Sequence, residues 1–325
     1  MKLLEVENLS IKFHTRKGVL EAVREVSFSL EQGETLGIVG ESGCGKSITN
    51  LALMGLLPDT AEVTASKIIF NGQDLLKINE KEWQKIRGGD IGMIFQDPMS
   101  ALNPSFSVGF QIEETLKIHQ TDLSKIDRAN KALQLLEQVG IPAPKERLKQ
   151  YAHELSGGMS QRVMIAMAIA CEPKLLIADE PTTALDVTIQ DQILRLLKDL
   201  QEKHNMGMIL VTHDLGVVAQ NADRIQVMYA GEVVESGASS GIITSPVHPY
   251  TEGLLSSLPG KKASGFREEL PSIAGMVPDL AARPKGCQFH PRCQYVVDEC
   301  RMKETCLQES DGRLFSCHYP LGGKA

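Results

Sequence analysis

Short apolar runs that stop at glycine or at polar residues recur along the chain. They are "TLGIVG" (residues 35–40), "KLLIAD" (174–179) and "MILVTHD" (208–214). Continuous apolar runs of this length are typical of strands that are buried on both faces of a parallel sheet. The pattern therefore predicts buried strands at these three positions.

A helical pattern separates the second and third runs. In "VTIQDQILRLLKDLQEKHN", apolar residues recur at helical spacing with charged residues on the opposite face: Ile189, Ile193, Leu196, Leu197 and Leu200. The first run is likewise followed by a stretch compatible with a helix. Strands that alternate with helices predict an α/β fold with a mostly parallel sheet.

Two regions depart from this alternation. Residues 107–150 contain the amphipathic segments "SVGFQIEETLKIH" and "RANKALQLLEQVG" with no strand pattern between them, and Gly140 and Pro142 stop the second. We expect a helical subdomain, residues 97–158, inserted into a core domain of residues 1–237. Beyond residue 237 the chain is rich in Pro, Gly and Cys, with one short helix expected near "YTEGLLSSL". Residues 238–325 are therefore expected to form a small Cys-rich accessory domain.

The stretch "GESGCGKS" after the first predicted strand matches the pattern G-x-x-x-x-G-K-[ST]. Its glycines allow backbone N–H groups to face phosphate oxygens, Lys46 adds a positive charge, and Ser47 offers a hydroxyl to Mg²⁺. This loop predicts the nucleotide-binding core of a P-loop NTPase; a glycine-rich turn without a ligand is the alternative. The candidate nucleotide-binding residues in it are Gly40, Glu41, Ser42, Gly43, Cys44, Gly45, Lys46 and Ser47.

An acidic pair ends the second predicted strand. Asp179 is placed to hold Mg²⁺ through water, and Glu180 is the candidate general base that polarises the attacking water. Alone, such a pair can equally be an exposed turn. Together with the phosphate loop it predicts nucleotide hydrolysis.

A second glycine pair begins the long apolar helix predicted after "LSGGMSQR". Ser156, Gly157 and Gly158 would form another anion-binding helix start, which the first loop does not need. We therefore expect a head-to-tail pair of subunits, each nucleotide lying between residues 40–47 of one chain and residues 156–158 of the other. A capped helix with a flexible start is the alternative.

Composition excludes some classes of protein. The formal net charge of −7 over 325 residues argues against a nucleic-acid partner. The longest apolar run, "VMIAMAIAC", has nine residues, whereas a membrane span needs roughly twenty. The N-terminus lacks an uninterrupted signal-peptide core, so we expect the chain in the cytoplasm.

At this point the sequence resembles the ATP-binding cassette (ABC) ATPases over residues 3–237. By this resemblance, Phe13 stacks on adenine, Gln96 in "IFQDP" senses Mg²⁺ and the membrane subunit, and His213 contacts the γ-phosphate. The segment "ALD" (residues 184–186) resembles the loop that crosses the dimer interface. Met159 departs from the common "LSGGQ" signature, and we expect no loss of activity from it.

The likeness extends to the ATP-binding subunits of dipeptide and oligopeptide importers, with nickel importers as close relatives. It is carried by "IFQDPMSALNP", "HPYT" (residues 248–251) and the tail from "GCQFHPRC" to "CHYP". The resemblance implies ATP and Mg²⁺ as ligands and a location on the cytoplasmic face of the inner membrane. The implied partners are a second ABC ATPase subunit, identical or paralogous, two membrane permeases and an extracytoplasmic solute-binding protein. A soluble ABC ATPase of DNA repair or translation and a degenerate regulatory cassette are the alternatives.

Seven cysteines complete the candidate chemistry. Cys287, Cys293, Cys300 and Cys317 follow C-x5-C-x6-C-x16-C, without the paired C-x2-C knuckles of zinc ribbons. By the resemblance they hold a [4Fe–4S] cluster; zinc and unligated thiols are the alternatives. Cys306 is a departure from the family pattern. Cys44, at a helix start beside Lys46, is predicted to have a lowered pKa and to react readily; an inert thiol that faces the core is the alternative.

Overall fold

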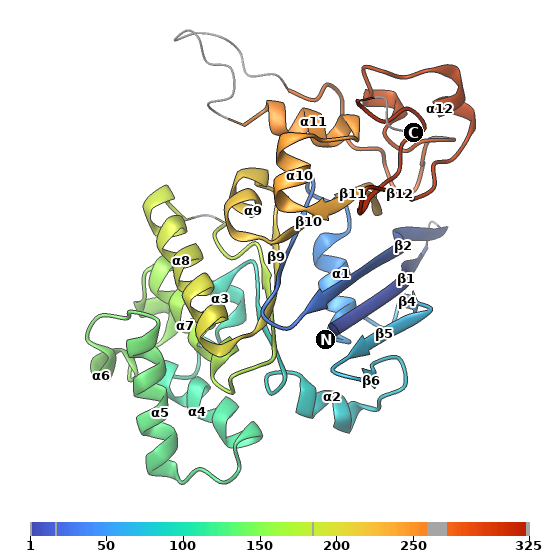
Figure 1. Ribbon diagram of the computed structural model, residues 1–325. Coiled ribbons are helices and arrows are strands. Elements are labelled where there is room, and N and C mark those ends of the chain that lie inside the picture. The colour runs from blue at the N-terminus through green and yellow to red at the C-terminus, as the bar shows by residue number, and fades with distance from the viewer. Residues whose placement is uncertain (1, 17, 184, 259–271, 323–325) are drawn as a thin grey trace, which may run out of the picture. The chain divides into compact units, whose positions relative to one another are not determined.

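The computed structural model describes residues 2–16, 18–183, 185–258 and 272–322. The chain divides into two compact units (Figure 1). The first contains Glu31–Glu34 and Lys77–Ile209, with the first residues of the chain. The second contains Leu4–Leu30, Thr35–Leu76 and the described part of the chain from Leu210 onward.

The first unit combines a parallel strand pair with a set of helices. Strands β7 (Ile91–Ile94) and β8 (Leu175–Asp179) are parallel, with Ile91 opposite Leu175, and every residue of both is buried. Strand β9 (Gly207–Thr212) begins in this unit and ends in the second. The helical elements are α2 (Glu80–Ile86), α3 (Pro98–Ala101), α4 (Val108–His119), α5 (Lys125–Gln138), α6 (Pro144–Arg147), η1 (Ala152–Glu154), α7 (Gly157–Ile169) and α8 (Val187–His204).

Helices fill the part of the chain between β7 and β8, where the helical insertion is predicted. Residues 95–174 contain helices and turns but no strand, apart from one isolated bridge between Ser107 and Tyr151. Ser107 caps α4 by accepting from the N–H of Phe110, and Ser124 and Asp127 form a capping box at the start of α5. Each such cap contributes about 1 kcal/mol, so polar residues at these positions fix where the helices begin.

The second unit contains an antiparallel sheet in the order β2-β1-β5-β6, with β4 also paired to β1. Leu4 lies opposite Phe70 and Phe13 opposite Ala61. Side chains two residues apart in a strand project to the same face, so buried Leu4 and Val6 share a face of β1, as do buried Leu9 and Ile11 beyond Asn8. The strands are β1 (Lys2–Thr15), β2 (Gly18–Glu31), β4 (Ala61–Thr64), β5 (Lys67–Phe70) and β6 (Gln73–Asp74).

A mixed set of strands completes this unit. Strand β3 (Thr35–Val39) is parallel to β10 (Arg224–Tyr229), and β10 continues antiparallel through β11 (Glu232–Ala238), β13 (Arg313–Phe315) and β12 (Gln308–Ser310). The pair β3–β10 is thus parallel, whereas the pairs that follow it toward β12 are antiparallel. The helical elements are α1 (Lys46–Leu53), α9 (Leu215–Asn221), α10 (Ser239–Thr244), α11 (Pro249–Ser256), η2 (His290–Arg292) and α12 (Asp298–Met302).

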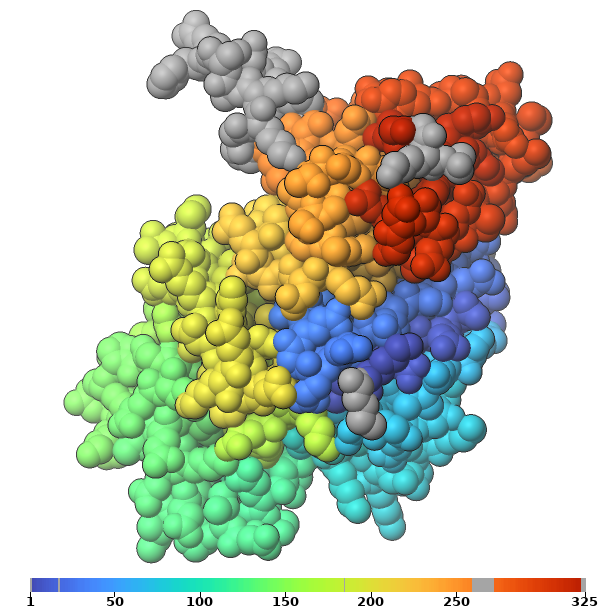
Figure 2. Space-filling model, in the orientation of Figure 1, coloured from blue at the N-terminus to red at the C-terminus, as the bar shows by residue number. Residues whose placement is uncertain are grey.

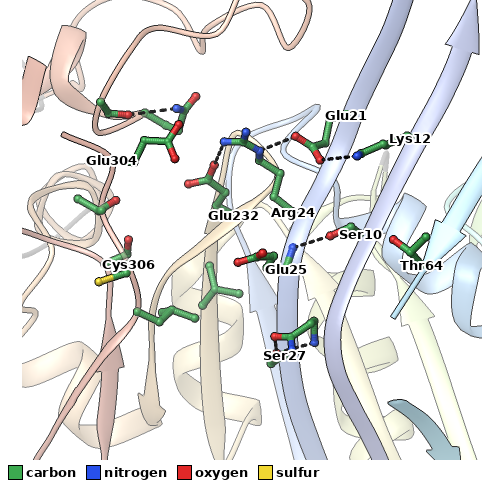
Figure 3. A pocket seen from close by; sticks show the side chains of 17 residues that line it. Ser10, Lys12, Glu21, Arg24, Glu25, Ser27, Thr64, Glu232, Glu304 and Cys306 are labelled. Carbon is green, nitrogen blue, oxygen red and sulfur yellow. Dashed lines mark hydrogen bonds and ion pairs between the residues drawn. The ribbon is translucent and has the colours of Figure 1, made fainter. Parts of the chain in front are cut away.

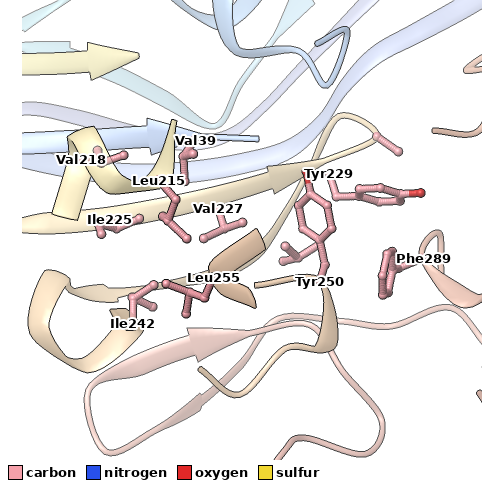
Figure 4. Close-up of a cluster of buried hydrophobic side chains, with 12 residues drawn as sticks. Val39, Leu215, Val218, Ile225, Val227, Tyr229, Ile242, Tyr250, Leu255 and Phe289 are labelled. Atoms are coloured by element: carbon pink, nitrogen blue, oxygen red, sulfur yellow. The ribbon is translucent and has the colours of Figure 1, made fainter. Parts of the chain in front are cut away.

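A buried apolar cluster ties the C-terminal segment to the strands of this unit (Figure 4). Val39 of β3 and Val227 of β10 belong to the same cluster as Leu255 of α11 and Phe289. The cluster includes aromatic rings, and those of Phe289 and Tyr229 pack edge to face at 5.2 Å between ring centroids. In Figure 2 the surface of the C-terminal segment (red) adjoins that of β1 and β2 (blue).

None of the helices in the described residues combines the length and the apolar character that a membrane span requires.

Candidate nucleotide-binding site

The phosphate loop, residues 40–47, joins buried strand β3 to helix α1. Gly43 and Gly45 have φ of +80° and +98°, in the left-handed region that favours glycine. At Gly40 space is the constraint, because an added Cβ would lie 2.2 Å from the carbonyl oxygen of Met228. The motif glycines are therefore required by the fold of this chain itself.

The side chain of Lys46 lies inside the phosphate loop. Its side chain is buried, and Nζ donates to the carbonyl oxygens of Gly40 at 2.7 Å and Glu41 at 3.1 Å. Ser42 and Gly43 are exposed, so this part of the loop is open to a ligand. Backbone N–H groups at a helix start and a lysine ammonium together suit the phosphates of a nucleotide.

The prediction of a reactive Cys44 is wrong. Its side chain is fully buried, and burial raises the pKa of the thiol, whereas nearby Lys46 lowers it by less. Lys46 Nζ lies 3.8 Å from Sγ. The thiol packs beneath the loop, where an added Cβ at Gly40 would meet Sγ at 2.7 Å. Cys44 is a packing residue at neutral pH, because desolvation outweighs the lysine charge.

The acidic pair lies at the carboxyl end of β8. Asp179 is buried, and Glu180 is half-buried with φ of +47°. Gln96, just after the neighbouring strand β7, donates from Nε2 to Glu180 Oε2 at 3.1 Å, and Thr183 donates to the same oxygen at 2.8 Å. The structure therefore brings Gln96 and Glu180 together. Left-handed backbone at a residue other than glycine costs about 1–3 kcal/mol and is concentrated at functional sites.

The second glycine pair begins α7. Ser156 caps the helix, since its Oγ accepts from the N–H of Met159 at 3.4 Å. Gly157 is exposed, and the nearest atom to a Cβ built there is Leu185 Cδ2 at 4.0 Å; at Gly158 it is Ile189 Cγ2 at 3.3 Å. Within its own unit this is a capped helix start, with room for a side chain at Gly157 and a tight contact at Gly158.

The remaining residues carried over from the family lie on three elements. Phe13 is half-buried on β1, and His213 is exposed just after β9. Asp186 caps α8 by accepting from the N–H of Ile189 at 3.0 Å. Ala184 lies outside the described residues. Phe13, His213 and the phosphate loop belong to the second unit, whereas Gln96, the acidic pair and residues 156–158 belong to the first.

The four cysteines of the tail line one small pocket of about 20 Å³, together with buried His248. Burial raises the pKa of Cys287 and of Cys317 to about 11, and it also raises the pKa of Cys293. No disulfide joins them. Among the described residues, no group of three or more His, Cys, Asp or Glu side chains is placed to hold a metal ion. The expected iron–sulfur cluster therefore gains no support from this arrangement.

Cys306 is separate from the other four tail cysteines. It is exposed and lines a cavity of about 490 Å³, with Glu304 from the same segment and polar side chains of β1 and β2 (Figure 3). Arg24 of this cavity pairs with Glu21 at 2.6 Å and with Glu232 at 3.0 Å. Since acidic side chains already hold this arginine, the cavity is a poor site for phosphate.

Sequence reasoning missed two side chains that contact the phosphate loop. Tyr250 and Arg292, from the C-terminal segment, both reach Glu41. Both lie in segments that carry the family likeness, "HPYT" and "GCQFHPRC". Their separations from Glu41 along the chain are 209 and 251 residues, so no local pattern could have indicated the contact.

Comparisons with known proteins agree with this geometry. Residues 23–183 match the ABC transporter family model, and residues 234–300 match the oligopeptide/dipeptide transporter C-terminal region. Among solved structures, the dimeric post-hydrolysis ATP-binding cassette MJ0796 bound to ADP and Pi is 28% identical with a TM-score of 0.65; it covers 73% of this chain and 98% of that chain. The cbiO1 structure from Clostridium perfringens, part of the cbiONQ ABC transporter complex, is 28% identical with a TM-score of 0.64, covering 75% and 91%. The fold and its loops thus define an ABC ATPase.

Relatives that match nearly the whole chain show to which group of ABC ATPases it belongs. The dipeptide transport ATP-binding protein DppD of Escherichia coli (strain K12) is 55% identical over 99% of this chain and 98% of its own length. DppD of Bacillus subtilis (strain 168) is 55% identical over 97% and 94%, and the oligopeptide transport ATP-binding protein OppD of that strain is 55% identical over 91% and 82%. The chain belongs to this family of peptide-transport ATP-binding proteins.

Proposed function

We propose that the chain hydrolyses ATP to energise import of dipeptides or oligopeptides through a membrane ABC transporter. The observation that carries this proposal is similarity to peptide-transport ATPases along nearly the whole chain, through both the cassette and the C-terminal region. The same similarity supports a division into a cassette of residues 1–237, with residues 97–158 as its helical subdomain, and a C-terminal domain of residues 238–325.

In this proposal the phosphate loop binds the ATP phosphates. Lys46 would leave the carbonyl oxygens that now accept from it and turn its ammonium toward the β- and γ-phosphates. The hydroxyl of Ser47 and the carboxylate of Asp179 are oxygen donors, which Mg²⁺ prefers. When bound, the ion neutralises charge that develops on the phosphates. Phe13 stacks on adenine, and His213 donates to the γ-phosphate.

Glu180 acts as the general base. It accepts a proton from water as the water oxygen attacks the γ-phosphorus and the bond to the β-phosphate oxygen breaks, which gives ADP and inorganic phosphate. The hydrogen bonds from Gln96 and Thr183 to one carboxylate oxygen orient the other oxygen for that role. Gln96 would thereby report on the state of the base to a neighbouring subunit.

The proposed partners follow from the open second loop. Ser156, Gly157 and Gly158 would close on nucleotide held by a second ABC ATPase subunit, identical or paralogous, and the MJ0796 cassette is dimeric. Two membrane permeases and an extracytoplasmic solute-binding protein would complete the importer, with this chain peripheral on the cytoplasmic face of the inner membrane.

The finer proposal for the cysteine pocket is a [4Fe–4S] cluster held by Cys287, Cys293, Cys300 and Cys317. The proposal rests on the family resemblance and on the suitability of four thiolates as ligands of such clusters. The four thiols line one pocket, but among the described residues they are not grouped closely enough to hold a metal ion. The pocket of about 20 Å³ would have to widen and the thiols to lose their protons. Iron and acid-labile sulfide in anaerobically purified protein would support the cluster. Absence of both from protein that is folded would refute it.

Glu180→Gln tests the proposed function. Because Gln cannot accept the proton, ATP turnover should fall at least about hundredfold, and uptake of a labelled dipeptide should be lost in cells with this variant as the only copy. Glu202→Gln is the matched control, since Glu202 is exposed on α8. Uptake of an unrelated nutrient should continue. Unchanged ATP turnover would refute the assignment of Glu180 as the general base. Lost turnover with normal dipeptide uptake would mean that the importer carries another cargo, such as longer peptides or nickel.

A further inference from the structure

Two residues of the C-terminal segment form hydrogen bonds with Glu41, the second residue of the phosphate loop. The backbone N–H of Glu41 donates to Tyr250 Oη at 2.9 Å, and Arg292 Nη1 donates to Glu41 Oε2 at 2.9 Å. Tyr250 lies on α11 and Arg292 ends η2. Both the backbone and the side chain of one loop residue are thus fixed by parts of the chain outside the cassette pattern.

Tyr250 is a rigid anchor. It is fully buried and packs between Tyr229 at 4.7 Å and Phe289 at 5.4 Å between ring centroids (Figure 4). Burial raises the pKa of Tyr250, so it stays a neutral phenol whose oxygen accepts from Glu41. The start of α11 is itself held, because buried Glu235 accepts from the N–H of His248 at 3.0 Å.

Arg292 is equally fixed before any ligand arrives. Only 5% of its side chain is exposed, against 28% of that of Glu41. Its Nε donates to Ala274 O at 3.0 Å and its Nη2 to Ile273 O at 3.3 Å. Its guanidinium lies 5.7 Å from the ring centre of Tyr229. A planar guanidinium held on three sides loses little further freedom when it pairs with a carboxylate.

The pairing matters because of what the loop has to bind. Glu41 places a carboxylate on a loop that receives a polyanion, and like charges within a few ångströms repel strongly where water is partly excluded. A paired carboxylate presents far less of this repulsion. In addition, a bonded Glu41 N–H fixes the backbone from which the next N–H groups of the loop project.

We propose that Arg292 and Tyr250 are positioning residues for the nucleotide. Arg292 neutralises Glu41, and Tyr250 fixes its backbone, so that the loop is ready for triphosphate before ATP binds. This inference rests on the proposed function. Arg292 also ends the turn between Cys287 and Cys293, so the conformation of the cysteine segment and the affinity for ATP are linked through one ion pair, and each affects the other.

The experiment measures binding of the ATP analogue AMPPNP and of ADP, each with Mg²⁺, to the full-length chain by calorimetry. Arg292→Gln should weaken AMPPNP binding about tenfold, because it leaves an unpaired carboxylate beside the phosphates. ADP, with less charge, should lose less. The double variant Glu41→Gln/Arg292→Gln should recover most of the loss. Tyr250→Phe should weaken AMPPNP binding about threefold through the released Glu41 N–H.

Arg301→Gln is the matched control, since Arg301 is an exposed arginine of the same segment, and it should bind as the wild type does. Circular dichroism checks that the variants are folded. If Arg292→Gln is unfolded, Arg292→Lys, which keeps the charge, replaces it. This variant should lose affinity for AMPPNP about threefold. Wild-type binding by Arg292→Gln, or a loss that the double variant does not recover, would overturn the inference alone. Absence of AMPPNP binding by the wild type would overturn the proposed function and the inference with it.

Discussion

The phosphate loop and the loop at the start of α7 both carry glycines, but for different reasons. At Gly40 a Cβ would lie 2.2 Å from the backbone oxygen of Met228, so this chain's own atoms forbid a side chain. At Gly157 the nearest atom to such a Cβ lies 4.0 Å away. The fold of the chain would thus tolerate a side chain at Gly157, and the proposed reason for the glycine is the nucleotide of a second subunit. Folding therefore constrains the first loop, whereas at Gly157 the proposed constraint is assembly.

The largest effect that would test this contrast is on stability. Gly40→Ala should lower the free energy of unfolding by about 3 kcal/mol, because backbone has to move to admit the methyl group. Gly157→Ala should leave it unchanged or raise it by about 0.5–1 kcal/mol, since alanine favours a helix over glycine. Urea unfolding of the two variants measures both.

The same pair separates folding from turnover. Gly157→Ala should remain folded and bind AMPPNP, but its ATP turnover should fall if a second subunit needs the space above Gly157. Equal stability of the two variants, or full turnover by Gly157→Ala, would remove the distinction between the loops.

A further effect concerns pH and a residue that supports the anchor of the phosphate loop. His248 is buried, and desolvation lowers its pKa from 6.5 to about 3; its Nδ1 accepts from the N–H of Tyr250, which anchors Glu41. The unfolded chain binds a proton at this histidine below pH 6.5 and the folded chain does not. The free energy of unfolding should therefore fall as the pH drops from about 6.5, by up to about 1.4 kcal/mol per unit.

His248→Gln isolates this contribution. The variant should show a flatter decline of stability between pH 6.5 and 4 than the wild type in parallel urea titrations. Identical slopes would mean that His248 is protonated in the folded chain. The other titratable groups that line its pocket, Cys287, His290, Cys293 and His318 among them, are common to both proteins and cancel in the comparison.

The smallest effect is a difference in labelling. Cys44 is fully buried and its thiol has a raised pKa, so maleimide should leave it unmodified on the timescale on which exposed Cys306 reacts. A cysteine introduced by Ser156→Cys, at an exposed position, should react as Cys306 does. Mass spectrometry of the labelled peptides compares the three sites, and rapid labelling of Cys44 would show that the phosphate loop opens.

Local patterns predicted much of the cassette. The three apolar runs became β3, β8 and β9, because a buried parallel strand needs apolar residues on both faces. The helix over residues 187–204 and those of the insertion followed from their periodicity and caps. Short strands β12 and β13 in the Cys-rich tail were missed, since three residues carry no periodicity.

The site was predictable only where a motif is contiguous. The phosphate loop, residues 40–47, and the acidic pair could be predicted because each is a run of adjacent residues that the sequence displays directly. The burial of Cys44 could not, because it depends on how the loop folds over the thiol. The hold of Tyr250 and Arg292 on Glu41 depends on the path of the chain over more than 200 residues.

The free space above Gly157 bears on how a cell would deal with faulty copies. A chain destabilised as expected for Gly40→Ala spends more time unfolded, so proteases degrade more of it and intact copies do the work. A chain altered at Gly157 would escape that surveillance, because nothing in its own fold signals the fault. In the proposed importer it would sit beside a normal subunit and stall it, so the milder structural change would have the dominant phenotype.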